Sequence, residues 1–461
     1  MLLQQVARGC CQLKQLAAPA SLGSTWRHLT AHTYPGELSG GIHLTEEQLG
    51  MQALAHDFAR EQMLPHAAQW DEQKIFPVEV MREAAKLGFA GLYVPEEYGG
   101  SGLGRLDGSL IFEGLSYGDI STAAYLTIHN MVAYVVNKFG SQALKEQHLP
   151  QLASLDKLAS YCLTEPGSGS DAASLATAAV PVEGGWLLSG SKAFISGAGA
   201  SDVYLVMARC QGQMLSQQEV DAAAAEGASG SGAGSTVGGG SSSTNGAGGS
   251  GSGAITAFLV EKEWPGVSFG ASERKMGWRS QPTGTVNLDK VFVPAANMLG
   301  QQGSGFRIAM HALDGGRINI AACSVGGAAY CLDYAWQYTS ERQQFGQPIG
   351  SFQATQFKLA DMATGLEASR AMVRGAAVAL DEQSPRATLA AAMAKRFATD
   401  TCYNVANDAL QLLGGYGYLM DHPVERYCRD LRVHSILEGT NEIMRLIIHR
   451  QLQRLDYHHL V

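Results

Sequence analysis

The chain has 461 residues, of which 46% are hydrophobic, and this length is enough for two or three domains with separate cores. Its formal net charge of -9 argues against nucleic acid as a partner, and no apolar run approaches the roughly 20 residues of a membrane-spanning helix. The eight cysteines form no CxxC pair and the thirteen histidines no HExxH motif, so we expect reduced thiols and no metal site.

The first segment of the chain is basic and free of acidic residues. Arg8, Lys14 and Arg27 all precede the first acidic residue, Glu37. Because organelle-targeting segments are basic and poor in acid, we expect residues 1–36 to be a mitochondrial transit segment outside the fold. The alternative is an ordinary basic tail on the protein surface.

Residues 37–160 are expected to form an N-terminal helical domain. The stretch Thr45-Glu46-Glu47-Gln48 predicts a capping box, in which the Thr and Gln side chains satisfy free backbone N–H groups. Apolar residues then follow at helical spacing: Met51, Leu54, Ala55 and Phe58. Further helical segments extend to about residue 158 and are interrupted by the turn-forming residues 98–102.

Residues 161–296 are expected to form a middle β domain. Short apolar segments separated by Gly, Ser and Asn turns favour an antiparallel sheet or barrel. The strand candidates are residues 186–188, which precede a Ser-Gly turn, and residues 203–208, 255–260 and 285–289.

A Gly/Ser insert at residues 211–254 separates two of these strand candidates. It contains almost no apolar anchors, so it cannot bury enough surface to offset its ordering entropy, and we expect a disordered hairpin extension. Gly246, Gly248 and Gly251 form a GxGxxG pattern, but a dinucleotide fingerprint follows a strand and opens a helix. The pattern is therefore interpreted as a chance match.

Residues 297–461 are expected to form a C-terminal helix bundle, because residues 306–338, 352–381 and 388–413 are long, Ala-rich and periodic. The order of helices, a small β domain and a bundle predicts an α+β multidomain fold. No alternation of strands and helices appears, so a Rossmann fold is not supported.

Four motifs carry possible chemistry, each with a plain structural alternative. Residues 161–171 join an apolar run to a Gly/Ser loop that suits a phosphate or a flavin edge, or is a turn. Residues 193–197 offer Phe194 beside a hydroxyl, which could cover a flat ring or be a buried strand position. Residues 411–417 end a helix in glycines, as a helix terminus or a phosphate contact.

The fourth motif, residues 436–442, puts Glu438 in an apolar setting just before a helix. Burial raises the pKa of a carboxyl group and makes it a better base. The alternative is an acidic residue that complements the dipole at the start of a helix.

Together and in this order, the motifs resemble the acyl-CoA dehydrogenase family over nearly all of the chain after about residue 42. The stretches CLTEPGSGSDAAS (162–174) and QLLGGYGYLMDHPVERYCRD (411–430) match two family signatures, and residues 342–346 and 437–440 match two more blocks. The resemblance implies an N-terminal helical domain, a central antiparallel β domain and a C-terminal helix bundle. It also implies FAD, an acyl-CoA substrate, electron-transfer flavoprotein as acceptor, a homotetramer built as a dimer of dimers, and the mitochondrial matrix.

The resemblance implies roles for particular residues of this sequence. Glu438 is the expected base, which takes the α-proton while the β-hydrogen leaves as hydride to flavin N5, with the thioester carbonyl polarised by fixed donors. The residues expected to contact FAD are Tyr161, Cys162, Leu163, Thr164, Gly169, Ser170, Phe194, Ile195, Ser196, Arg342, Phe345, Gln353, Gln411, Gly414, Gly415, Thr440 and Glu442. The residues expected near the acyl-CoA are Ser170, Asp314, Gly315, Gly316, Arg317 and Arg450. Many family members carry Trp where Phe194 stands, which leaves indole-specific contacts in doubt.

Within the family, the sequence resembles the branch that oxidises isobutyryl-CoA in valine breakdown, through residues 191–199, 280–283 and 315–321. Other branches carry their base as a Glu directly before the Arg that matches Arg317; here that residue is Gly316, so the base is expected at Glu438. Gly315 and Gly316 would also leave room for a branch at the α-carbon, or serve helix packing only.

Three other functions are compatible with parts of this sequence pattern. One is a dehydrogenase for another short or branched acyl-CoA. Another is an acyl-CoA oxidase, which the chain end His458-His459-Leu460-Val461 disfavours because it lacks a peroxisomal SKL signal. The third is a non-catalytic assembly factor on the same fold, which the retained Glu438 argues against.

Overall fold

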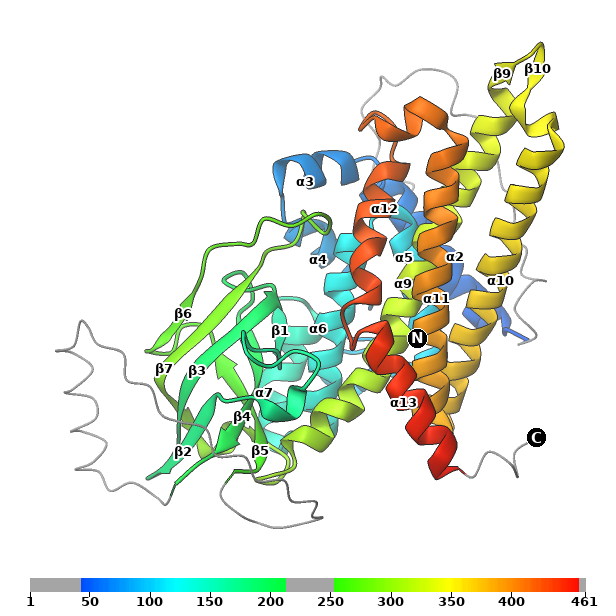
Figure 1. The fold of residues 1–461 in the computed structure, drawn as a ribbon. Helices are drawn as coiled ribbons and strands as arrows, with labels where there is room; N and C mark the ends of the chain where they lie inside the picture. The colour runs from blue at the N-terminus through cyan, green and yellow to red at the C-terminus, as the bar shows by residue number, and fades with distance from the viewer. Residues whose placement is uncertain (1–42, 213–252, 456–461) are drawn as a thin grey trace.

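The computed structural model describes residues 43–212 and 253–455 of the chain. The expected transit segment 1–36, most of the insert 211–254 and the last six residues lie outside the described residues. Within the described part, helices, a sheet and further helices follow one another along the chain (Figure 1). This order confirms the α+β fold that the sequence predicts.

The N-terminal part is helical, as expected. Its helices are α2 Glu46–Phe58, which continues as a π-helix over Ala59–Met63, α3 Ala67–Gln73, α4 Val78–Lys86, α5 Arg105–Gly118, α6 Ile120–Phe139 and α7 Gln142–Ala153. The capping box before α2 is confirmed: the Gln48 N–H donates to Thr45 Oγ1 at 3.2 Å, and the Thr45 N–H donates to Gln48 Oε1 at 3.1 Å.

The middle part is an eight-stranded sheet. Its strands are β1 Ala159–Cys162, β2 Ala178–Val182, β3 Gly185–Ser196, β4 Val203–Cys210, β5 Ile255–Glu261, β6 Val267–Phe269, β7 Thr283–Pro294 and β8 Met298–Leu299. The order is β6-β7-β3-β2-β4-β5-β8, and β1 pairs with β4 outside this path. All four strand candidates fall within strands.

Two details of the sheet differ from the sequence expectation. The sheet is mixed rather than antiparallel, because β4 pairs in parallel with both β1 and β2. The expected turn at Ser189-Gly190 is wrong, since both residues lie inside β3. The pairing of β3 with β7 shifts in register between Leu188 and Gly190, so the glycine marks a bulge within a long strand.

The C-terminal part is a bundle of long helices. They are α9 Gly305–Glu341, α10 Gln353–Asp381, α11 Ala387–Leu412, α12 Val424–Arg432 and α13 Asn441–Arg454. A small hairpin of β9 Gln343–Gln344 and β10 Gln347–Pro348 joins α9 to α10. The three helices expected at residues 306–338, 352–381 and 388–413 are therefore confirmed within a few residues.

One apolar core joins the two helical parts, because buried residues of α2, α5, α6, α9, α10 and α11 form a single cluster. Helix α9 is central to it and packs against α5, α6, α10 and α11 (Figure 1). A second cluster joins α6, α7 and the start of α9 to β1, β4 and β5, and a third fills the other face of the sheet. Helices α6 and α9 thus connect bundle and sheet.

Residues 43–212 and 253–455 contain no helix with the length and apolar character to cross a membrane. Over the same residues, no three His, Cys, Asp or Glu side chains group as metal ligands would.

Candidate active site

Glu438 lies in the short loop between a 3-10 helix, Val433–Ser435, and α13. Its φ angle is 57°, and that of the next residue, Gly439, is 91°, so two consecutive residues adopt the left-handed region. This region costs a non-glycine residue about 1–2 kcal/mol, and such strain persists where the surroundings hold a residue in place. The loop conformation of Glu438 is therefore imposed by contacts around it.

One oxygen of the Glu438 carboxylate is shielded from solvent, although the residue as a whole is partly exposed. Its Oε2 atom is buried and has no hydrogen-bond partner among the described residues. Burial raises the pKa of Glu438 to about 7, while the nearby cations Arg317 and Lys395 act in the opposite direction. A carboxyl group whose pKa lies near neutrality can accept a proton and hold it, which suits a general base.

Arg317 on α9 holds the base loop from one side. Its Nε donates to the Glu438 carbonyl oxygen at 3.2 Å, and its Nη1 donates to Asp314 Oδ1 at 2.6 Å. Asp314 also accepts a hydrogen bond from Thr388 Oγ1 on α11 at 2.8 Å. Asp314 and Arg317, expected beside the acyl-CoA, thus form an ion pair, and its arginine binds the backbone of the loop that carries the base.

The two glycines before Arg317 face different neighbours. A Cβ atom built on Gly316 would lie 2.5 Å from Glu438 Oε2, so this glycine makes the space that the carboxylate occupies. A Cβ on Gly315 would lie 2.5 Å from Nη1 of Arg105, a buried guanidinium stacked between two tyrosine rings at 3.9 and 4.1 Å. Gly316 therefore adjoins the base, whereas Gly315 admits Arg105.

The loop at residues 161–171 lies against the end of β3, which carries residues 193–196 of the second motif. The Ala193 N–H donates to the Thr164 carbonyl oxygen at 2.9 Å. Lys192, which is fully buried, donates to the Leu163 carbonyl oxygen at 3.2 Å and to Glu165 Oε1 at 2.7 Å. A buried ion pair thus fixes the Gly/Ser loop against β3.

Two aromatic residues of these motifs, Tyr161 and Phe194, differ in burial. The Tyr161 hydroxyl is buried without a hydrogen-bond partner in the part of the chain that the structure describes, and its pKa is raised by burial and then by the nearby charge of Glu438. Phe194 has a φ of 57° and is 69% exposed, so its ring projects from the strand instead of filling the core. The alternative of a buried Phe194 is therefore wrong.

The remaining expected residues of these motifs differ in exposure. The side chains of Cys162 and Ile195 pack into the sheet core, so only their backbone can face a ligand. Gly169 and Ser170 are exposed, and a Cβ added to Gly169 would meet nothing within 4 Å. The loop therefore presents an open stretch of small residues.

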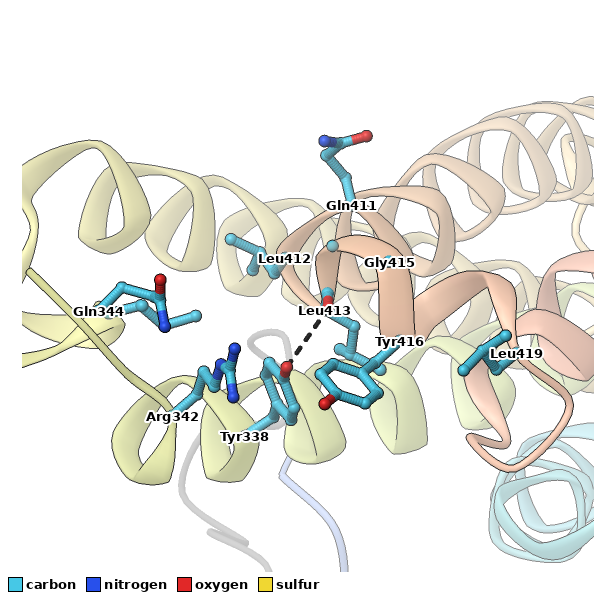
Figure 2. A pocket seen from close by; sticks show the side chains of 11 residues that line it. Tyr338, Arg342, Gln344, Gln411, Leu412, Leu413, Gly415, Tyr416 and Leu419 are labelled. Carbon is cyan, nitrogen blue, oxygen red and sulfur yellow. Dashed lines mark hydrogen bonds between the residues drawn. The ribbon is translucent and has the colours of Figure 1, made fainter.

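The expected residues at the far end of the bundle line a separate surface pocket of about 420 Å³ between the end of α9 and the end of α11 (Figure 2). Tyr338 spans it by donating to the Leu413 carbonyl oxygen at 3.4 Å. The pocket is lined by Tyr338, Arg342, Gln344, Ile349, Gln411, Leu412, Leu413, Gly414, Gly415, Tyr416 and Leu419.

The other expected residues lie on exposed surfaces. Phe345, in the β9–β10 hairpin, is 93% exposed, and Gln353 is exposed at the start of α10. Thr440 is the N-cap of α13 and accepts a hydrogen bond from the backbone N–H three residues on. Glu442 and Arg450 lie exposed on α13.

Within one chain, the expected cofactor residues therefore form two groups. One group surrounds Glu438 and the edge of the sheet, and the other lies at the β9–β10 end of the bundle, well away from the sheet (Figure 1). The pocket at the β9–β10 end is therefore lined by none of the residues expected around Glu438.

Sequence reasoning missed three buried cations that shape this region: Arg105, Lys192 and Lys395. Lys395 could have been noticed in the sequence, because it stands in the Ala-rich stretch 390–398. A lysine on the apolar face of a helix is rarely buried unless it has a partner. The partners of Arg105 and Lys192 are distant in sequence and gave no local signal.

Two helical parts joined to a mixed sheet, with a shielded carboxylate at their junction, define a fold of the acyl-CoA dehydrogenase class. Sequence comparison agrees over most of the chain. The acyl-CoA dehydrogenase N-terminal domain matches residues 45–156, the middle domain residues 160–239 and the C-terminal domain residues 303–453. The chain belongs to the acyl-CoA dehydrogenase family.

Individual relatives narrow the comparison. The chain is 50% identical to the mitochondrial isobutyryl-CoA dehydrogenase of Dictyostelium discoideum, over 90% of this chain and 91% of that protein. It is 48% identical to the mitochondrial isobutyryl-CoA dehydrogenase of Bos taurus, over 89% of each. Among solved structures, the butyryl-CoA dehydrogenase of Megasphaera elsdenii is 36% identical with a TM-score of 0.78, covering 89% of this chain and 99% of that one. An FAD complex of PigA is 29% identical with a TM-score of 0.78, covering the same shares.

Proposed function

We propose that the chain oxidises isobutyryl-CoA to methacrylyl-CoA with FAD as its cofactor, and that Glu438 removes the α-proton. The observation that carries this proposal is the Glu438 carboxylate in the space left by Gly316, with its Oε2 atom buried and without a hydrogen-bond partner among the described residues. The names of the relatives from Dictyostelium discoideum and Bos taurus support the choice of substrate.

The residues at the sheet edge fit a flavin. The exposed Phe194 ring and the Ser196 hydroxyl suit the face and edge of a flat ring. The Tyr161 hydroxyl has no hydrogen-bond partner among the described residues, and the charge of Glu438 contributes to raising its pKa. The loop around Gly169 has room for a close backbone approach. When bound, FAD supplies the acceptor for the hydride that leaves the β-carbon of the substrate.

The base loop offers two functions at one residue. The Glu438 carboxylate accepts the α-proton, which a pKa of about 7 allows near neutral pH. The Glu438 backbone N–H donates no hydrogen bond to any described residue, so it is free to polarise a thioester carbonyl. A donor and a base on one residue hold the carbonyl and the α-carbon in a fixed relation.

The second group of expected residues supports an assembled enzyme. Arg342, Gln411, Gly414 and Gly415 line the pocket at the far end of the bundle, and Phe345 projects nearby into solvent. We propose that these residues complete the FAD site of a neighbouring subunit in a homotetramer built as a dimer of dimers. Electron-transfer flavoprotein is the proposed acceptor, and the mitochondrial matrix the proposed compartment.

The Gly at position 316 also bears on substrate choice. The Glu438 carboxylate fills the space beside this glycine, so a side chain at position 316 would push the base toward the acyl group and narrow the room for a branch at the α-carbon. We expect the highest kcat/KM with isobutyryl-CoA, lower values with 2-methylbutyryl-CoA and butyryl-CoA, and little turnover of isovaleryl-CoA or long chains.

The test is an anaerobic titration of the purified holoenzyme with this panel, followed by turnover with electron-transfer flavoprotein or an artificial acceptor. Bleaching of the flavin by isobutyryl-CoA supports the proposal. A preference for isovaleryl-CoA would overturn the substrate and leave the family intact. Bound FAD that no acyl-CoA bleaches would favour a non-catalytic assembly factor.

A further inference from the structure

Lys395 is a fully buried lysine in the middle of α11. Its ammonium donates to the Gly439 carbonyl oxygen at 2.8 Å and to Asn441 Oδ1 at 2.9 Å. An ammonium withdrawn from water is costly unless acceptors surround it, and both acceptors here belong to the segment that carries the base. The side chain therefore connects the core of the bundle to the residues just after Glu438.

Asn441 extends this connection to the start of α13. Its Nδ2 donates to Thr399 Oγ1 at 2.9 Å and to Asp400 Oδ1 at 2.7 Å, both on α11. Asn441 is buried and is the first residue of α13. The N-terminus of α13 is thereby fixed to α11 one turn beyond Lys395.

Two cations on two helices hold two consecutive carbonyl groups of the base loop. Arg317 on α9 binds the Glu438 carbonyl oxygen at 3.2 Å, and Lys395 on α11 binds the Gly439 carbonyl oxygen at 2.8 Å. These are the two residues with left-handed backbone angles. Charge-assisted hydrogen bonds are the stronger kind, so this pair of contacts explains how the strained path of the loop is held.

The charge of Lys395 also acts on the carboxylate itself. Arg317 and Lys395 are the two groups that oppose the rise in the pKa of Glu438 caused by burial. Burial lowers the pKa of Lys395 to about 8; Glu438, Asp400 and Glu442 favour its charged form, while Arg317 disfavours it. His434 also lies close, and Lys395 helps to lower its pKa.

We propose that Lys395 is a positioning residue for the base: it fixes the loop that carries Glu438 and keeps the carboxylate ionised enough to accept a proton. This inference rests on the proposed function and assigns a role to a side chain that does not itself contact the reacting atoms.

The central experiment compares Lys395→Met with the wild-type holoenzyme, using isobutyryl-CoA and an artificial acceptor. Met keeps the length of the side chain and removes the charge and the donors. We expect kcat to fall about 10- to 100-fold with KM within about threefold, because the loss lies in the proton transfer and not in binding. The acidic limb of the pH profile should move to higher pH, since loss of a cation raises the pKa of a carboxyl group.

Two further variants separate geometry from charge. Lys395→Arg keeps the charge and should restore most of the rate and the wild-type pH profile. Lys395→Gln keeps one donor without charge, so it should fold even if Lys395→Met does not, and should retain the shifted pH profile. Lys358→Met, which removes a lysine paired with Asp408 on the bundle surface, is the matched control and should change neither kcat nor the profile.

Wild-type kcat and an unchanged pH profile in both Lys395→Met and Lys395→Gln would overturn the inference. A loss of kcat in both without any shift of the profile would reduce Lys395 to a packing role and also overturn it. Failure of the proposed function is distinguishable, because it would appear as flavin reduction that survives in Glu438→Gln.

Discussion

A Cβ atom on Gly316 would lie 2.5 Å from Oε2 of Glu438 and 2.8 Å from its carboxyl carbon. Side chains do not approach a Cβ this closely, so the carboxylate fits only because residue 316 has none. The two residues lie on different elements, the central helix α9 and the loop before α13. The absence of a side chain on one element therefore fixes where the reactive group of the other can stand.

Gly316→Ala should consequently reduce activity much more than stability. The added methyl group would push the carboxylate out of its place, and a displacement of about 1 Å at a reacting group can cost on the order of 100-fold in rate. We expect such a fall in flavin reduction by isobutyryl-CoA, with a loss of unfolding free energy of about 1–3 kcal/mol.

The control is Gly375→Ala in α10, where an added Cβ would meet nothing within 4 Å. That variant should keep full activity and gain about 0.5–1 kcal/mol, since alanine is the better helix former. Equal effects of the two substitutions on activity would contradict the role assigned to Gly316.

Glu438→Gln should retain FAD and lose flavin reduction, because the amide keeps the shape of the side chain and cannot accept the proton. In the wild-type enzyme the rate of reduction should rise with pH, reach half of its maximum near pH 7, where half of the Glu438 carboxyl groups are ionised, and level off about one pH unit higher. Stopped-flow measurement of flavin bleaching from pH 5.5 to 8.5 tests both points. Near wild-type bleaching by the variant would exclude Glu438 as the base.

The same pKa shift predicts an effect on stability with a definite sign. The pKa of Glu438 is raised in the folded chain, so the folded state retains the proton more tightly than the unfolded state. Wild-type stability should therefore fall as pH rises from about 4.5 to 7, by about 1–3 kcal/mol after allowance for solvent screening. Glu438→Gln lacks this loss of stability. The melting temperature of the variant minus that of the wild type should therefore increase across that pH range and stay constant above it.

Local sequence signals predicted the elements of the fold well. The capping box at Thr45 and the strand candidates rest on contacts within a few residues, and each was found where the pattern indicated. The loop at Thr164 and the strand at Phe194 were expected to share one site, and the hydrogen bond from Ala193 to Thr164 joins them.

Contacts between distant residues could not be predicted in the same way. Nothing near β4 in the sequence indicates that it pairs in parallel with β1 and β2. The direction of a strand relative to its neighbour depends on the path of the connection between the two strands. Gly315 and Gly316 are adjacent and looked equivalent, yet a helix turns about 100° per residue, so one faces Arg105 and the other Glu438.

Phe345 provides a test of the proposed cross-subunit site. Its ring is 93% exposed in the single chain, which suits a residue that becomes covered by a neighbouring subunit or its cofactor. We expect Phe345→Ser to lower the FAD content per chain several-fold and to shift the assembly toward smaller species, measured by flavin absorbance and light scattering. Phe292→Ser, an exposed aromatic on β7, is the control and should change neither property.

Hydrogen bonds join the residues that flank the Gly/Ser insert on its two sides. The Gly253 N–H donates to the Cys210 carbonyl oxygen at 2.7 Å, and the Cys210 N–H donates to the Ala254 carbonyl oxygen at 3.0 Å. Arg209 also donates to the Gly253 carbonyl oxygen. Deleting residues 227–252 keeps these contacts and shortens the connection between Cys210 and Gly253 from 42 to 16 residues. The lower cost of loop closure should stabilise the protein by about 1 kcal/mol, with unchanged kcat/KM for isobutyryl-CoA.

Deleting residues 227–254 instead also removes Gly253 and Ala254, so it should lower the melting temperature by loosening the pairing of β4 with β5. A large loss of activity or stability in the shorter deletion would show that the insert contributes to the fold or to the site.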